Sequence, residues 1–204
     1  MKILIACEES QAVCIEFRKR GHEAFSCDIL PCSGGKLEWH IQDDVLKHLN
    51  EGWDMMIAHP PCTYLSYVGM RHWNKPGRAE KREEAMKFFM SLINAPIEKI
   101  CVENPLGYPS KVYRKPDETI HPYYFGEPFQ KRTCLWLKNL PLLKWDKEKV
   151  VKPEPLYILK GKKGFGKKIH WVEGISGLRK EERQRARSKT FQGIAEAMAT
   201  QWNF

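Results

Sequence analysis

Residues 2–28 read KILIACEESQAVCIEFRKRGHEAFSCD, and this stretch decides the fold class. The apolar run 2–6 predicts a buried strand. Residues 11–20 repeat apolar side chains at helical spacing and predict an amphipathic helix, which Gly21 ends. Residues 23–27 predict a second strand. The chain therefore opens as a strand, a helix and a strand.

The same alternation continues toward the C-terminus. We predict strands at 53–58, 99–102 and 133–137, a short helix at 45–49, a long helix at 78–94 and a helical end at 180–202. Alternating strands and helices predict an α/β fold with a mostly parallel sheet and helices on both faces. In such sheets, ligands gather at the carboxyl ends of the strands.

The bulk composition suits one main domain. The chain has 204 residues, of which 42% are hydrophobic, enough for a substantial core. No stretch approaches the roughly 20 apolar residues that a membrane span needs. The first residues reach Cys7-Glu8-Glu9 too early for a signal peptide. We therefore expect a cytoplasmic monomer that binds no membrane. The seven cysteines contain no CxxC pair, which favours neither a disulfide framework nor a metal site.

The positive charge is concentrated in one segment. Residues 144–189 hold 15 Lys and Arg against 6 Asp and Glu, so the whole net charge of +9 lies there. Such a patch suits a polyanion, most commonly nucleic acid, although a solvated lysine-rich surface is the alternative. Two β-like runs, 156–159 and 169–172, flank a tip rich in glycine and lysine and predict a small basic β-hairpin.

Three residues at predicted strand ends are candidates for chemistry. The sequence AHPPCTYLS at 58–66 presents Cys62 on a proline-stiffened loop after a strand, where a thiolate is a carbon nucleophile; a buried cysteine is instead inert. Glu103 follows the 99–102 strand and is suited to protonating a ring nitrogen, or simply to capping the next segment. Arg132 is suited to holding a thiolate, a phosphate or a base, or is a plain surface arginine.

The first loop indicates the kind of cofactor. Glu8 follows the first strand and Asp28 comes twenty positions later, a spacing common for an acidic residue that holds ribose hydroxyls. The usual glycines are absent from this turn. Because a loop without them does not approach a pyrophosphate closely, the turn argues for a cofactor without phosphates.

The order of these motifs resembles the DNA cytosine-5 methyltransferase family, whose PPC, ENV and QxR elements follow one another in the same order. The matching elements are the acidic first loop, Asp28, Asp43-Asp44, Pro60-Pro61-Cys62, Glu103-Asn104, Gln130-x-Arg132 and Gln192-Gly193-Ile194-Ala195. The resemblance spans nearly the whole chain, and the short length is similar to forms carried by bacteriophages and mobile elements. It implies a Rossmann-like class I methyltransferase fold.

The resemblance also implies roles for the residues. Cys62 attacks C6 of a cytosine, Glu103 engages N3, and Arg132 holds the base and the thiolate, while S-adenosylmethionine methylates C5. A base within duplex DNA has to be flipped out first. Asp28 binds the cofactor ribose, and Asp43 or Asp44 the adenine amino group. The full set of implied cofactor contacts is Cys7, Glu8, Asp28, Ile29, Asp43, Asp44 and Pro60.

The chain departs from the family in several places. The first turn is ACEES, His59 stands where glycine is usual, Asn104-Pro105 replaces asparagine-valine, and Cys134 occupies a second arginine position. The interval between the QxR element and the last helix is short. We expect a catalytic core over 1–143, a basic recognition insertion over 144–178 and a C-terminal helix over 179–204. Candidate DNA contacts are Lys162, Lys163, Lys167, Lys168, His170 and Gln130, with Phe165 and Trp171 available to bases or sugars.

Two other functions fit the same sequence. The first keeps the chemistry but acts on RNA or a pyrimidine nucleotide. The second is a nucleic-acid-binding protein that retains the fold without catalysis, which the ACEES turn favours.

Overall fold

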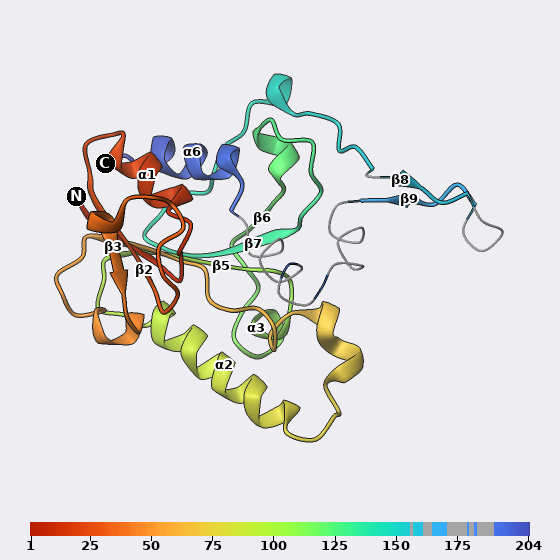
Figure 1. Cartoon of the computed structure of the whole chain (residues 1–204), viewed down its shortest axis with the longest axis horizontal. Helices are drawn as coiled ribbons and strands as arrows, with labels where there is room; N and C mark the ends of the chain where they lie inside the picture. Colours follow the sequence, from red (N-terminus) through yellow and green to blue (C-terminus); the bar gives the residue numbers. More distant parts are fainter. Residues whose placement is uncertain (156, 161–164, 171–178, 180–181, 183–189) are drawn as a thin grey trace.

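A computed structural model describes residues 1–155, 157–160, 165–170, 179, 182 and 190–204. Its main feature is a seven-stranded sheet in the order β3-β2-β1-β4-β5-β7-β6 (Figure 1). The strands are β1 Lys2–Ala6, β2 Glu23–Asp28, β3 His40–Gln42, β4 Met55–Ala58, β5 Lys99–Asn104, β6 Glu118–Ile120 and β7 Thr133–Lys138. All neighbours pair in parallel except β7, which runs antiparallel to both β5 and β6. The predicted α/β fold with a mostly parallel sheet is confirmed.

Helices cover both faces of this sheet. In the described ranges, the helices with full bounds are α1 Ala12–Arg18, α2 Arg78–Ile93, α3 Tyr108–Val112 and α6 Gln192–Gln201, with 3-10 turns η1 Leu37–Trp39, η2 Val45–Lys47, η3 Tyr67–His72, η4 Pro122–Phe125 and η5 Lys147–Lys149. Figure 1 shows α2 along one face and α1 with α6 on the other.

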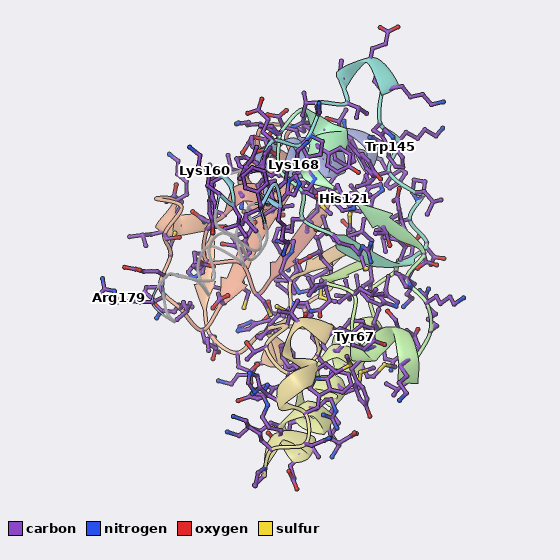
Figure 2. The ribbon with its side chains drawn as sticks, turned by 90° about the vertical axis from the view of Figure 1, so that its right-hand side faces the viewer. Tyr67, His121, Trp145, Lys160, Lys168 and Arg179 are labelled. Carbon is purple, nitrogen blue, oxygen red and sulfur yellow. The ribbon has the colours of Figure 1, made fainter. Side chains whose placement is uncertain are left out.

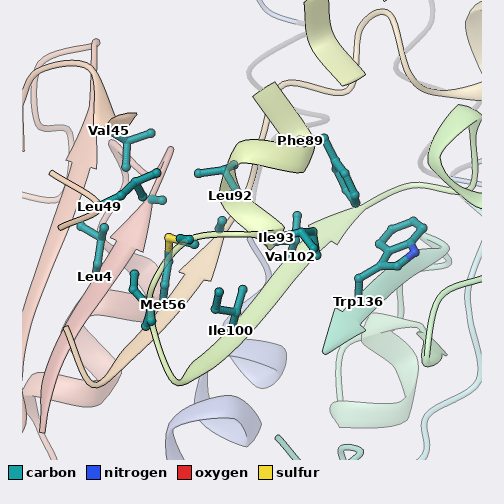
Figure 3. Packing of buried hydrophobic residues seen from close by; sticks show 14 of the residues in the cluster. Leu4, Val45, Leu49, Met56, Phe89, Leu92, Ile93, Ile100, Val102 and Trp136 are labelled. Atoms are coloured by element: carbon teal, nitrogen blue, oxygen red, sulfur yellow. The ribbon is translucent and has the colours of Figure 1, made fainter. Parts of the chain in front are cut away.

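Alternation along the strands divides the core into two layers, because successive side chains point to opposite faces. Leu4, Met56 and Ile100 face α2, and in that layer the Phe89 ring meets the Trp136 ring edge-on, with 5.2 Å between centroids (Figure 3). The other layer packs Ile3, Ile5 and Ile57 against Phe17 of α1 and Met198 of α6. Continuous apolar runs in the central strands are explained by burial on both sides.

Several predicted boundaries differ from the structure. The 53–58 strand begins only at Met55, because the Asp54 carboxylate instead accepts a hydrogen bond from the Lys2 amide at 2.7 Å. The 99–102 strand continues to Asn104, which pairs with Cys134 of β7. The 45–49 helix is one 3-10 turn, and the 133–137 strand continues to Lys138.

The predicted C-terminal helix is present in its last part as α6, and Glu182 near its expected start is also helical, but Thr190 and Phe191 directly before α6 are not. Phe191 has an extended backbone and α6 starts at Gln192. Of residues 180–189, only Glu182 is described. The strands β3 and β6 and the helix α3 were absent from the prediction.

The predicted basic hairpin is present in its described part. β8 (Tyr157–Ile158) pairs antiparallel with β9 (Lys168–Ile169), and the Leu159 amide donates to the Lys167 carbonyl at 3.0 Å. Figure 1 shows the hairpin projecting from the sheet. The predicted tip residues Lys162 and Lys163, and Trp171 beyond β9, lie outside the described residues. In the part of the chain that is described, no helix is long and apolar enough to cross a membrane.

Candidate functional site

The loops after β4 and β5 meet at the carboxyl end of the sheet. These strands are direct neighbours, with Ala58 opposite Val102. Beyond the pairing, the buried Asn104 side chain donates a hydrogen bond from Nδ2 to the Pro60 carbonyl at 2.9 Å. The proline loop that carries Cys62 is therefore fixed to the strand end that carries Glu103.

Cys62 lies at the start of a tight turn. It is partly buried, and its carbonyl accepts hydrogen bonds from the amides of Leu65 at 3.1 Å and Ser66 at 2.9 Å. Such a turn after two prolines leaves little backbone freedom around the thiol.

The far side of the turn is docked on the segment that follows β5. The Tyr108 amide donates to the Leu65 carbonyl at 2.7 Å, and the Tyr67 amide to the Leu106 carbonyl at 3.3 Å. Between them, Gly107 approaches so closely that an added Cβ would lie 2.0 Å from the Leu65 carbonyl oxygen. Only glycine fits at this crossing, so the docking depends on it.

Glu103 lies beside His59 and is acted on by the charge of Lys131. His59 Nδ1 is 3.4 Å from Glu103 Oε2, and both side chains are mostly buried, with 11% and 16% exposed. Burial by itself raises the pKa of Glu103, but the positive charge of Lys131 and the contact with His59 outweigh it and hold this pKa below its ordinary value. Glu103 is therefore ionised at neutral pH.

A small cavity lies beside this group. Its lining residues are His59, Glu103, Lys131, Thr133, Thr190, Phe191, Ile194 and Met198. Its volume of about 10 Å³ is close to the minimum for one water molecule and far below that of a pyrimidine ring. The start of α6 therefore closes one side of Glu103, and a ring-sized ligand would have to reach Glu103 from another side.

Lys131, and not the predicted Arg132, supplies the charge that acts on Glu103. Arg132 and Gln130 are exposed. Burial, and then the charge of Arg132, lowers the pKa of His121. Sequence reasoning gave no role to Lys131 or His59, although a polar residue directly after a buried strand is a signal that could have identified His59.

Glu8 is bound to the first helix. It is 2% exposed, and its two oxygens accept the amides of Val13 at 2.8 Å and Cys14 at 3.2 Å. Burial raises its pKa, while the charge of nearby His59 and the two amides oppose that rise. The carboxylate thus occupies the start of α1, where orphan amides and the helix dipole favour an anion.

The turn around Glu8 has an unusual backbone. Cys7 and Gln11 have φ values of 60° and 59°, in the left-handed region. The Gln11 side chain is buried and binds the next loop, because its Nε2 donates to the Lys36 carbonyl at 2.8 Å and its Oε1 accepts the Lys36 amide at 3.0 Å. Burial chiefly raises the pKa of the Cys7 thiol, which argues against a reactive thiolate there.

The predicted cofactor residues of β2 lie at the strand end. Asp28 is partly buried, accepts the Leu30 amide at 2.9 Å, and has a pKa raised chiefly by burial. Ile29 beside it is 73% exposed. A carboxylate next to an accessible apolar side chain suits ribose hydroxyls and the face of an adenine.

The two acidic residues after β3 are already engaged. Asp43 accepts hydrogen bonds from Lys47 at 2.7 Å and His48 at 3.2 Å, and Lys47 is the main cause that lowers its pKa to about 2. Asp44 caps η2 by accepting the Leu46 amide at 3.0 Å. Both side chains still border solvent.

The hairpin region carries the described candidates for nucleic-acid contact other than Gln130. Lys167 and Lys168 are exposed, Phe165 is 82% exposed, and His170 is partly buried. Figures 1 and 2 place the hairpin and η3, which follows the Cys62 turn, on the same side of the molecule, with Lys168 and Tyr67 labelled in Figure 2. Among the described residues, no three His, Cys, Asp or Glu side chains gather as metal ligands.

Comparison with known proteins adds no assignment to this geometry. No protein-family model matches the chain, and no curated protein matches it.

Proposed function

We propose that this protein is an S-adenosylmethionine-dependent methyltransferase that modifies C5 of cytosine in DNA through a covalent adduct at Cys62. The observation that carries the proposal is the joining of the two loops, in which Asn104 ties the Cys62 loop to the strand end of Glu103 at 2.9 Å. A nucleophile and a carboxyl group on adjacent strand ends suit addition to one side of a ring and hydrogen bonding to a nitrogen of the same ring.

The resemblance to the cytosine-5 methyltransferases supplies the proposed roles of these residues. The Cys62 thiolate adds to C6, and Glu103 engages N3, so that electron density builds up at C5. After C5 is methylated, a base removes its proton and elimination releases Cys62. Arg132 is exposed and follows Lys131, which lines the cavity beside Glu103, and it would hold the base or its phosphate.

The residues at the ends of β1, β2 and β4 fit the cofactor. In open α/β sheets, ligands bind where the strand order reverses, which here lies between β1 and β4. Asp28 would hold the ribose, Ile29 the adenine face, and Asp43 or Asp44 the adenine amino group, with Cys7, Glu8 and Pro60 lining the turn. When bound, S-adenosylmethionine supplies the methyl group. The sheet with its antiparallel β7 supports a class I methyltransferase fold.

DNA is the preferred substrate because of the basic segment. Its charge is concentrated over 144–189, and the exposed Lys167 and Lys168 lie on the side of the molecule that carries η3. Lysines that neutralise phosphates supply affinity without sequence information. We therefore propose binding that depends strongly on salt and discriminates only a short sequence.

The proposal is tested by nucleoside mass spectrometry on DNA from cells that express the protein, a Cys62→Ala variant or an empty vector. New 5-methylcytosine in the first sample alone is the expected result, because the variant lacks the nucleophile. Equal 5-methylcytosine from the variant would refute the covalent mechanism. The variant should keep its melting temperature and DNA binding, which separates loss of chemistry from loss of the fold.

The first turn favours a second candidate function, a nucleic-acid-binding protein that retains the fold without catalysis. The Glu8 carboxylate is committed to the helix amides and is 2% exposed, so it offers no group to a ligand. Isothermal titration with S-adenosylmethionine separates the candidates, because only the methyltransferase binds it. The same mass spectrometry applied to RNA and nucleotides tests those substrates.

A further inference from the structure

His59 is held firmly at the centre of the site. It follows β4 directly, and its amide donates a hydrogen bond to the Ala6 carbonyl at 2.9 Å. The side chain is 11% exposed, contacts the Glu103 carboxylate and acts electrostatically on a second carboxylate from another element. Glu103 lies 3.4 Å from its Nδ1, and the charge of His59 acts on the buried Glu8.

The proposed role of Glu103 needs a proton that Glu103 does not hold by itself. An ionised carboxylate only accepts hydrogen bonds, whereas a ring nitrogen such as N3 of cytosine is itself an acceptor. Lys131 and His59 keep Glu103 ionised in the protein without substrate. A donor in contact with the carboxylate therefore has to supply the proton when the base arrives. Histidine suits this task because its ordinary titration lies near neutral pH.

We propose that His59 is the proton donor to Glu103 and acts on the base only through it. When the base binds, the N–H bond at Nδ1 breaks, an O–H bond forms at Glu103 Oε2, and the imidazole is left neutral. The carboxyl O–H then turns toward the ring nitrogen. On release of the product the proton returns to Nδ1, so the pair ends each cycle as it began. This inference rests on the proposed methyl transfer.

The surroundings of His59 suit a shared proton. The first loop contributes Glu8, β5 contributes Glu103, and the segment before β7 contributes Lys131. A protonated His59 would therefore be attracted by the two carboxylates, Glu8 and Glu103, and repelled by the single ammonium group of Lys131. On the side of α6 the cavity is lined by Phe191, Ile194 and Met198, which do not titrate.

The test compares two variants that each remove one of the groups that lower the pKa of Glu103. His59→Gln keeps a side-chain N–H that donates to the carboxylate but carries no transferable proton. Lys131→Gln weakens the same electrostatic effect and leaves His59 in place. A third variant, His22→Gln, controls for losing a mostly buried histidine at the opposite end of the sheet, where His22 bonds Asn203 at 2.7 Å. Melting temperatures confirm that each variant folds.

Two measurements decide the proposal. For His59→Gln, kcat of methyl transfer between pH 5.5 and 9 should fall by about 10²-fold with KM for DNA unchanged, and the limb in which kcat falls as the pH rises through the titration of the donor should be lost. Lys131→Gln and His22→Gln should keep that limb. A His59→Gln profile of the wild-type shape would overturn the proposal.

The second measurement does not depend on activity. The carbon-13 signal of the Glu103 carboxyl group is titrated in the wild type and in His59→Gln. The pKa of Glu103 should rise in the variant because glutamine keeps a hydrogen-bond donor but has no charge to lower that pKa. An unchanged titration would overturn the coupling between the two residues. Wild-type protein without methyl transfer on any substrate would refute the proposed function, and the titration would still decide whether the pair is coupled.

Discussion

Replacing Gly107 with alanine should displace the loop that carries Cys62. Gly107 has an extended backbone, so the effect of the substitution is purely one of space. The new Cβ would lie 2.0 Å from the Leu65 carbonyl oxygen, while real Cβ contacts essentially never fall under 3.0 Å. The two backbones therefore have to separate by at least about 1 Å, which breaks the bond from the Tyr108 amide to Leu65. A shift of this size at a reacting group costs about 10²-fold in rate.

The same displacement has a cost in stability. Losing the Tyr108 bond and the neighbouring bond from Tyr67 to Leu106 should cost about 2 kcal/mol together. For a chain of this length, that lowers Tm by roughly 4–8 °C.

Calorimetry and initial rates of methyl incorporation measure both effects. Gly69→Ala is the matched control in the same loop, because its Cβ would lie 3.5 Å from the Thr63 carbonyl, an ordinary contact. If Gly107→Ala matched Gly69→Ala in Tm and in rate, the docking argument would be wrong.

Two further predictions concern the surface charges. Replacing Lys167 and Lys168 with glutamine should flatten the slope of log K for DNA against log salt by about 1.8, measured by fluorescence anisotropy, whereas changing the exposed Lys87 and Lys115 should not. The pKa of Asp43 is lowered from 3.8 to about 2, chiefly by Lys47. The ionised Asp43 therefore contributes to the free energy of unfolding above pH 4, and this contribution is lost as the pH falls to 2. Urea unfolding between pH 5 and pH 2 should show a smaller acid loss of stability in Asp43→Asn, and an identical loss would contradict the assignment.

The sequence predicts the centre of the sheet better than its edges. The central strands β1 and β4 are buried on both faces and therefore read as unbroken apolar runs. The short strands β3 (His40–Gln42) and β6 (Glu118–Ile120) carry too few residues for a periodic signal. Their place is set by pairing with neighbours, which is a tertiary effect.

The site shows the same division. Cys62 and Glu103 were found because strand ends are visible in the sequence, and adjacent parallel strands bring their ends together. The sequence does not reveal the importance of Lys131. The path of the chain before β7, and not the residue type, decides whether Gln130, Lys131 or Arg132 acts on Glu103. The contact between His59 and Glu103 spans 44 positions and likewise needs the fold.

Cys7 and Gln11 give the first turn a left-handed backbone without any glycine. Each position costs on the order of 1 kcal/mol or more in an L-residue, and glycine would remove that cost. A glycine in place of Gln11 would also remove the side chain that grips Lys36, and so would release the loop after β2. The turn therefore has a backbone conformation that usually requires glycine, while the Gln11 side chain at one of its left-handed positions holds the neighbouring loop. In this protein, a side chain carried by a left-handed residue in one loop fixes the position of the next.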